Sequence, residues 1–386
     1  MGATFIDRLG GALIFPFLSL YVAQKFDIGM TQVGLLFGTW SVSSIIGSTI
    51  GGALADRFGR KIILVAGLIF SAGTALMLGF VDDLGVFYLV AAFTGIFSDM
   101  GHPAQQAMVT DLLKGEQRAE GFSLLRIVAN LAIIFGPAMG GILSGVSYLL
   151  LFIIDAVAST LTALIVIAAI PETNPDHEES ASRKTTMQTL AGYLQVARDR
   201  LFMAFIAASI LMILVYTQMY STLSVFLYRE HELTARGFGF LMSINAAMVV
   251  FIQFWITRKL KRYPPMLLMI FASILYGIGF TMFGFIGIYP LFITAMAIIT
   301  IGEMVHIPSA QALAAHFAPE DMRGRYMAAF GFTWAFPNSV APFLAGLVMD
   351  NLNPDWVWYI AGMLSLAASA AFGFLYIKTR QRFRSA

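Results

Sequence analysis

Long apolar stretches separated by short polar segments follow one another along almost the whole chain. Each is close to the roughly 20 apolar residues that a membrane-crossing helix needs. They predict twelve spans at residues 4–23, 31–54, 62–80, 85–110, 121–144, 147–170, 201–227, 235–257, 266–286, 289–315, 326–349 and 356–377. Because most connections are short, consecutive helices are expected to be antiparallel neighbours. The pattern therefore predicts an all-α integral membrane protein.

The composition supports this prediction. Of 386 residues, 58% are apolar and 12% are charged, whereas a soluble domain has about 25% charged residues. Too few charges are present to cover a solvated surface, which excludes a soluble enzyme. The chain contains no Cys, so disulfides and thiolate metal sites are excluded as well.

The positions of Lys and Arg predict the orientation in the membrane. All but five of the 24 Lys and Arg residues fall in segments on the side of both termini. Arg8 and Arg126 fall inside spans, and Lys25, Arg229 and Arg236 lie in loops on the other side. Because cytoplasmic loops carry an excess of Lys and Arg, both termini are expected to be cytoplasmic. The expected location is the inner (plasma) membrane of the cell.

A shift of 205 residues aligns the two halves of the chain. It places Pro103 on Pro308 and Gly141 on Gly346, and it also aligns two cytoplasmic loops. The predicted organisation is a six-helix bundle over 1–170, a cytoplasmic central loop over 171–200 and a second six-helix bundle over 201–386. Two six-span repeats with pseudo-twofold symmetry are typical of transporters, which bind substrate near mid-membrane between the halves.

One cytoplasmic loop carries a compact motif between the second and third spans. Its residues of interest are Gly52, Asp56, Arg57, Gly59, Arg60 and Lys61. Gly52 is expected to allow close helix approach and Gly59 a turn with positive φ. Asp56 could accept from N–H groups at a helix N-terminus or from a basic partner. The motif could therefore latch the cytoplasmic ends of the two halves, the alternative being an ordinary positively charged loop.

This loop resembles the conserved loop motif of the major facilitator superfamily (MFS). The twelve spans, the repeat and the central loop agree with that family along nearly the whole chain. The resemblance implies secondary transport by alternating access, in which two bundles rock about a central cavity. The matching loop of the second half, from Lys259 to Pro265, keeps the positive charge but lacks the acid and the glycine.

The fifth span contains Gly136, Pro137, Gly140 and Gly141. Proline frees a backbone carbonyl and glycines thin the helix, which gives a bend and close packing. The segment resembles the antiporter motif of the drug:proton branch, although Ser123 and Ala132 stand where that branch has glycine. The resemblance implies export in exchange for protons, and a generic packing kink is the alternative.

Ionisable groups inside spans cost about 2.5–3.5 kcal/mol on insertion scales, so a functional role is the first hypothesis. The candidates for proton coupling in the cavity are Asp7, Arg8, Asp99, His102, Arg126, Asn130, Glu303 and His306. Asp99 and His102, like Glu303 and His306, are three residues apart and are expected on one helix face. Structural ion pairs or capped acids are the alternative, and Asp155 is interpreted as structural. A di-metal carboxylate site would need two further inward Glu residues, so no metal is expected.

Aromatic and amide side chains in the spans could line an adaptable pocket for substrate. The candidates are Tyr216, Gln218, Tyr220, Asn245, Trp334 and Asn338. Met-rich and aromatic walls suit varied ligands, but ordinary helix packing would use the same residue types.

Together these features favour a secondary active transporter that exports small lipophilic or cationic compounds in exchange for protons. A carrier of a sugar, organic acid or peptide, proton-coupled or facilitated, is the second hypothesis. A non-transporting membrane sensor is disfavoured because the predicted tails are short. No ATP-binding or hydrolase motif is present, so we expect neither an enzyme nor a cofactor other than the proton gradient. The expected partners are a small-molecule substrate and the lipid bilayer, with no nucleic acid, and the protein is expected to be a monomer.

Overall fold

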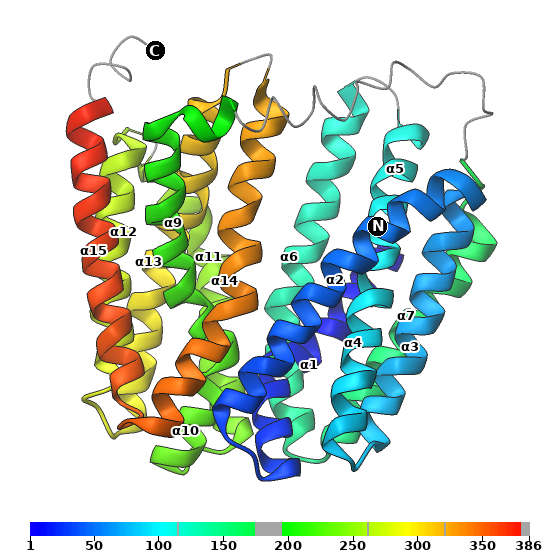
Figure 1. The fold of residues 1–386 in the computed structure, drawn as a ribbon, viewed down its shortest axis with the longest axis horizontal. Helices are drawn as coiled ribbons and strands as arrows, with labels where there is room; N and C mark the ends of the chain where they lie inside the picture. Colours follow the sequence, from blue (N-terminus) through cyan, green and yellow to red (C-terminus); the bar gives the residue numbers. More distant parts are fainter. Residues whose placement is uncertain (114–115, 174–194, 261, 320–321, 380–386) are drawn as a thin grey trace. The chain divides into compact units, whose positions relative to one another are not determined.

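The structure is a computed structural model that describes residues 1–113, 116–173, 195–260, 262–319 and 322–379. Within these ranges all the regular structure is helical (Figure 1). The helices are α1 (Gly2–Phe26), α2 (Met30–Phe58), α3 (Arg60–Phe80), α4 (Leu84–Met100), α5 (His102–Leu112), α6 (Glu116–Ser144), α7 (Tyr148–Ala169), α9 (Arg200–Ser221), α10 (Leu223–His231), α11 (Ala235–Leu260), α12 (Pro265–Met282), α13 (Tyr289–Phe317), α14 (Arg323–Asn351) and α15 (Trp356–Thr379).

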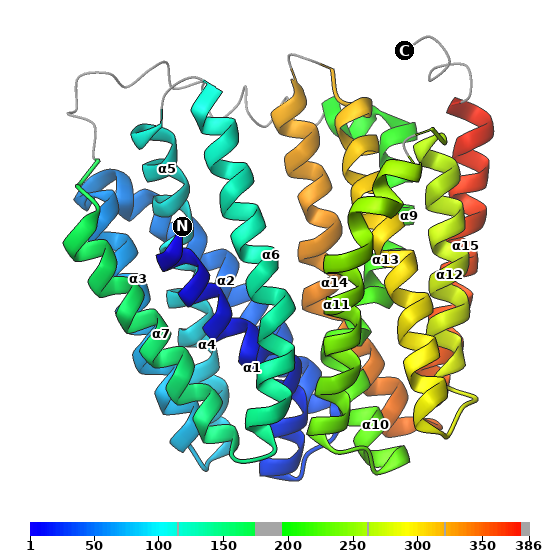
Figure 2. The same ribbon diagram turned by 180° about the vertical axis from the view of Figure 1, so that it is seen from behind.

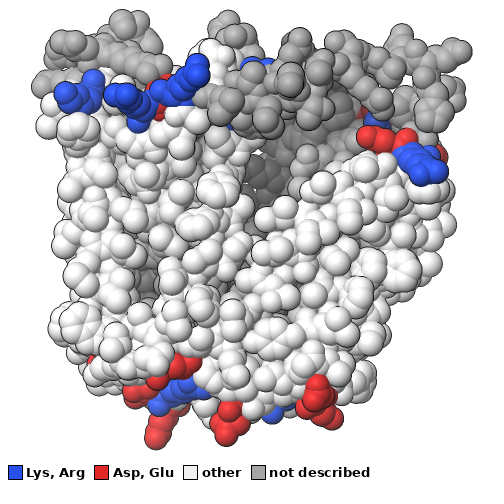
Figure 3. Space-filling model, viewed as in Figure 1, with Lys and Arg blue, Asp and Glu red and all other residues white. Residues whose placement is uncertain are grey.

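Twelve segments of the described chain are long and apolar enough to cross a membrane. They match the twelve predicted spans, most within about three residues at each end, so the predicted fold class is confirmed. Charged side chains on the visible face gather at the helix ends and leave an uncharged surface over the helix middles (Figure 3). Such a surface suits hydrocarbon, because a charge placed there would lose its hydration.

Two predicted spans are interrupted, which the apolar pattern alone did not indicate. The fourth is broken at Gly101 between α4 and α5. Pro103 has no backbone N–H to donate to the carbonyl of Asp99 four residues earlier, which explains why the helical hydrogen bonds are interrupted at this point. The seventh is interrupted at Thr222 between α9 and α10. There the hydroxyl groups of Ser221 and Thr222 lie 3.3 Å apart and hydrogen-bond to each other.

The internal repeat is visible in the helix boundaries. α2 and α11 begin at Met30 and Ala235, and α4 and α13 begin at Leu84 and Tyr289. Both pairs are 205 residues apart, the shift that aligns the sequence. The same shift relates Ser19 of α1 to Ser224 of α10, and these two buried hydroxyl groups contact each other at 3.2 Å.

The chain divides into two compact units. Unit 1 contains Met1–Glu179 and Tyr220–Ala246, and unit 2 contains Ser180–Met219 and Ala247–Ala386. In unit 1, α1 packs against α6 and α7, and α3 packs against α4 and α7. The same helices are seen from behind in Figure 2. In unit 2, α12 packs against α13 and α15, while α14 contacts α13 and α15. The domain boundaries drawn from the sequence stay a prediction, and the segment Tyr220–Ala246 packs with the N-terminal helices.

Close packing in unit 1 depends on glycines of α2. A Cβ at Gly47 would overlap the backbone of Ile96, and one at Gly51 would overlap the backbone of Met100, both on α4. At Gly52 the nearest atom to such a Cβ is 3.7 Å away, on Pro103, which is an ordinary contact. The expected close approach at Gly52 is therefore wrong by one residue, because Gly51 faces α4.

Candidate functional site

A carboxylate held by the first member of an aromatic cluster lies in unit 2. Glu303 of α13 is half-buried, and the hydroxyl of Tyr216 on α9 donates a hydrogen bond to its Oε1 at 2.9 Å. The Tyr216 ring stacks on Tyr276 of α12 at 6.0 Å and meets the edge of Trp334 of α14 at 5.8 Å. Residues from four helices of one unit are thus linked through Tyr216, which contacts the acid, Tyr276 and Trp334. We call Glu303, Tyr216, Tyr276 and Trp334 the aromatic site.

His306 lies one turn further along α13. It is 1% exposed, and its ring packs against Tyr276 at 5.7 Å. Tyr276 thus connects it to the aromatic site. The structure therefore brings together four residues that the sequence singled out: Glu303, His306, Tyr216 and Trp334.

Two predicted cavity amides serve to join α9 to α14. The Asn338 side-chain oxygen accepts a hydrogen bond from the hydroxyl of Thr217 at 3.1 Å. Gln218 Nε2 donates to the backbone oxygen of Ala341 at 3.2 Å. Gln218 is buried while Asn338 is exposed. Both side chains hold the helices of the aromatic site in register, and contact with a substrate stays a prediction.

A second group of acids lies in unit 1, between α1 and α7. Ser159 donates a hydrogen bond to Asp7 at 3.2 Å. The Asp155 carboxylate lies against the backbone of α1, where a Cβ at Gly10 would come within 2.6 Å of its Oδ1. Asp155 lies one helical turn before Ser159 on α7, and Gly10 lies about one turn after Asp7 on α1. Asp155, interpreted as structural from the sequence, therefore belongs with Asp7, and we call Asp7, Asp155 and Ser159 the acid pair site.

The remaining predicted groups of unit 1 lie around α5. Asp99 lies on α4 and His102 on α5, on either side of the break at Gly101, and their expected common face stays a prediction. Arg8 of α1 is exposed. His102 contacts Gln106 at 3.4 Å. The side chains of Arg126 and Asn130 lie outside the described residues.

Tyr220 and Asn245, two further cavity candidates, belong to unit 1. The Tyr220 ring contacts Phe15 of α1 at 6.4 Å, and Asn245 is buried. Neither is among the residues of the aromatic site.

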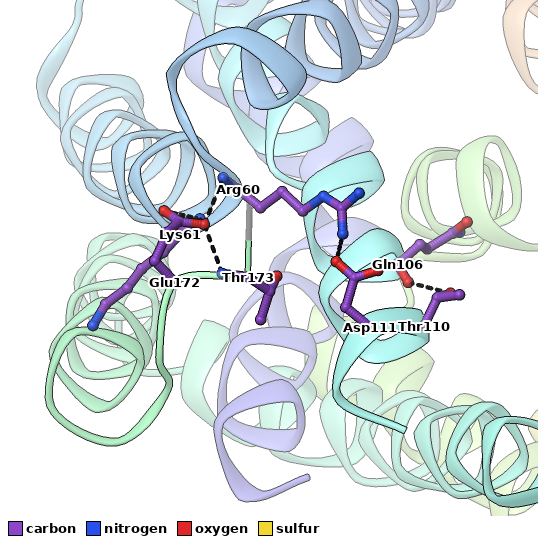
Figure 4. A network of polar contacts seen from close by, with 7 residues as sticks. All are labelled: Arg60, Lys61, Gln106, Thr110, Asp111, Glu172 and Thr173. Carbon is purple, nitrogen blue, oxygen red and sulfur yellow. Dashed lines mark hydrogen bonds and ion pairs between the residues drawn. The ribbon is translucent and has the colours of Figure 1, made fainter. Parts of the chain in front are cut away.

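The predicted loop motif forms a network at the start of α3 (Figure 4). Gly59 has φ of 103°, which confirms the predicted turn with positive φ. Arg60 forms an ion pair with Asp111 of α5. Glu172, after α7, accepts hydrogen bonds from the backbone N–H groups of Arg60 at 2.9 Å and Lys61 at 3.1 Å. The first N–H groups of a helix have no partner within it, so a carboxylate here satisfies and stabilises the N-terminus.

The acid in this network is therefore not the predicted one. Asp56 is exposed and has no hydrogen bond or ion pair within the described part of the chain, while Arg57 lies over the ring of Phe58 at 5.2 Å. Lys61 Nζ donates to the backbone oxygen of Ile167 at 2.7 Å. Sequence reasoning missed Glu172, although an acid directly after the sixth span was a signal for it. The latching role of the loop stays a prediction.

The glycines of the fifth span make close contacts. On α6, a Cβ at Gly136 would lie 2.7 Å from the backbone carbon of Ala12, and one at Gly140 would overlap the backbone of Leu13. A Cβ at Gly141 would lie 2.5 Å from the Cα of Gly239 on α11, which also belongs to unit 1. The predicted close packing around Pro137 is confirmed at these glycines. A role of the kink in antiport stays a prediction.

Comparison with known proteins gives the family and relatives. The sequence model described as Major Facilitator Superfamily matches residues 1–342. A Na(+), Li(+), K(+)/H(+) antiporter of Planococcus maritimus is 25% identical over 392 residues, covering 95% of this chain and 91% of the relative. Multidrug resistance protein 1 of Bacillus subtilis is 27% identical over 204 residues, covering 52% of this chain and 51% of the relative. The solved structure of nucleoside transporter NupG is 16% identical, with a TM-score of 0.79 over 97% of both chains, which is a likeness of fold alone.

Proposed function

Because the chain belongs to the Major Facilitator Superfamily, we propose that it exports small lipophilic cations in exchange for protons. In this proposal Glu303 is the group for which cation and proton compete. The observation that carries the proposal is the aromatic site, in which one carboxylate is bonded to Tyr216 and the ring of Tyr216 packs with two further aromatic side chains of the same unit.

The chemistry of the aromatic site suits such an exchange. An ionised carboxylate away from bulk water needs a counter-charge, because its solvation is reduced. A proton neutralises it, and so does a cation, but not both at once. Aromatic faces attract cations and offer apolar area to the rest of a lipophilic molecule. The hydroxyl of Tyr216 donates to the carboxylate and holds it in place for either partner.

Transport in proteoliposomes tests the proposal. With a pH gradient imposed, we expect the wild-type protein to move tetraphenylphosphonium against its concentration gradient. Glu303→Gln keeps the shape of the side chain but loses the charge, so the gradient-driven rate should fall at least roughly tenfold. Glu230→Gln, at an exposed acid on α10, is the matched control and should retain the wild-type rate. Full pH-driven transport by the Glu303 variant would refute the proposal.

A second candidate function is exchange of a monovalent metal cation for protons. The acid pair site favours it, because two carboxylates and a hydroxyl are the oxygen ligands that hard cations prefer. One relative over nearly the whole chain is a Na(+), Li(+), K(+)/H(+) antiporter. If this is the function, a sodium gradient should drive proton movement in proteoliposomes. Asp155→Asn should then abolish this flux and leave tetraphenylphosphonium transport unchanged. Absence of sodium-driven proton movement in the wild-type protein would exclude this candidate.

Carriage of a sugar, organic acid or peptide is the less favoured hypothesis, because such carriers usually have more polar groups in their cavities than the few amides of this chain, two of which also join α9 to α14. The proposed location is the plasma membrane, with both termini in the cytoplasm and the protein a monomer. The distribution of Lys and Arg along the sequence supports this orientation, and the bacterial relatives support the location.

A further inference from the structure

His306 and Ser209 are two buried polar side chains whose hydrogen-bonding capacity the protein does not use. Each is 1% exposed. Within the described residues, the two ring nitrogens of His306 have no hydrogen-bond partner, and the hydroxyl of Ser209 has none either. Buried polar groups nearly always have a partner, so this pair calls for an explanation. His306 is on α13 and Ser209 on α9, two helices of unit 2.

Both side chains line the same small pocket. Its other walls include Phe330, Thr333 and Trp334 of α14. The hydroxyl of Thr333 is already used, since it donates to the Phe330 carbonyl at 2.7 Å. The nine residues that line the pocket include no Lys, Arg, Asp or Glu. The open space is about 10 Å³, which is room for one polar group about the size of a water molecule.

The pocket adjoins the aromatic site. Trp334 lines the pocket and also contacts Tyr216, which holds Glu303. His306 lies three residues after Glu303, a rise of about 4.5 Å along α13. A molecule whose charged group lies at Glu303 could therefore place a second group in the pocket about one helical turn away.

We propose that this pocket binds one neutral hydrogen-bonding group of the transported molecule, such as a hydroxyl or an amide. The inference rests on the proposed function, because it adds a second recognition point to the cation site at Glu303. A neutral imidazole offers one donor and one acceptor, and the serine hydroxyl offers both. A hydroxyl or amide can satisfy both side chains, whereas a methyl group leaves them unpaired. The preferred substrates are thus lipophilic cations with a polar group about 5 Å from the charge, and His306 and Ser209 determine that preference.

Two matched probes test the proposal on the purified full-length protein. Propyltriphenylphosphonium and 3-hydroxypropyltriphenylphosphonium differ only in a hydroxyl about 5 Å from the charge. We expect the wild-type protein to bind the hydroxyl probe roughly tenfold more tightly, since a matched analogue without the polar group leaves buried partners unpaired. Ser209→Ala and His306→Leu should bring this ratio close to one, with the affinity for the propyl probe changed less than about twofold. His306→Gln, which keeps a donor and an acceptor, should retain part of the preference.

The possible failures are distinguishable. Binding of both probes by the wild-type protein with equal affinity would overturn the pocket proposal and leave the cation site standing, with the pocket holding only water. A preference unchanged in both Ser209→Ala and His306→Leu would overturn it as well. Glu303→Gln should lower the affinity for both probes by the same factor, because both carry the same charge. Failure of the wild-type protein to bind either probe would refute the proposed function and this inference with it. The wild-type ratio needs no variant, so the test holds even if His306→Leu does not fold.

Discussion

The two halves related by the shift of 205 residues share helix boundaries but join equivalent helices with different chemistry. In unit 1, α2 lies against α4 through Gly47 and Gly51. The shift of 205 residues places Ile252 and Ile256 of α11 at these two positions. Next to Ile252 on α11, the side chain of Gln253 donates a hydrogen bond to the Met304 carbonyl of α13 at 3.1 Å. Direct backbone contact thus joins α2 to α4, whereas a side-chain hydrogen bond joins α11 to α13. The repeat constrains where helices begin and end more tightly than how they are joined.

The starts of α3 and α12 show the same contrast. α3 begins after Gly59 with free N–H groups, and Glu172 accepts from them. α12 begins with Pro265, which has no N–H to satisfy. The polar sites differ too, because Asp7 and Asp155 lie near each other in unit 1, while in unit 2 Glu303 is bonded to a tyrosine of an aromatic cluster. A shared fold therefore leaves room for each unit to acquire its own chemistry.

The largest expected effect is on the glycine contact of unit 1. Gly51→Ala should lower the free energy of unfolding by about 2–3 kcal/mol, because the new methyl group meets backbone that cannot move aside. Gly52→Ala, at an ordinary 3.7 Å contact, should change it by less than about 0.5 kcal/mol. Unfolding midpoints in mixed micelles give the comparison. Equal losses for the two neighbours would show that the backbone contact does not govern the packing of this pair.

An intermediate effect is expected on cation binding at the aromatic site of unit 2. Trp334→Leu removes a ring next to Tyr216 and should weaken tetraphenylphosphonium binding by about 1–2 kcal/mol. Phe15→Leu removes a ring of unit 1 that contacts Tyr220 and should leave the affinity unchanged. Equilibrium binding to purified protein measures both. If the Phe15 variant lost as much affinity as the Trp334 variant, aromatic recognition of the cation could not be assigned to unit 2.

The smallest effect is expected at the start of α3. Glu172→Ala should lower the free energy of unfolding by about 1 kcal/mol, as loss of a capping acid typically does. Glu172→Gln, which keeps an oxygen acceptor, should lose less. Asp56→Asn should have no effect on stability, because that side chain is exposed. A larger loss for Asp56→Asn than for Glu172→Ala, seen in the unfolding midpoint, would reverse the assignment of the capping acid.

The twelve spans could be predicted because each is a long apolar run. In lipid such a run forms a helix, since its backbone N–H and C=O groups must then bond to one another. The sequence did not predict the break at Gly101, although Pro103, which has no N–H for the helical hydrogen bond to Asp99, was a local signal for it. Glu172 was missed because its partners lie more than 100 residues earlier in the chain. The nearness of Asp155 to Asp7 was not predicted, since it depends on which face of α7 meets α1, and the structural role assigned to Asp155 stays a prediction. Three of the four residues of the aromatic site were predicted, namely Glu303, Tyr216 and Trp334, but the part played by Tyr276 becomes apparent only from packing.

Proton release on cation binding tests the central claim most directly. In lightly buffered solution, the addition of tetraphenylphosphonium to purified wild-type protein should release protons where Glu303 is protonated, up to one for each cation bound. Glu303→Gln should release none, because the group for which proton and cation compete is gone. Cation binding without proton release by the wild-type protein at any pH, or equal release by the Glu303 variant, would contradict the account.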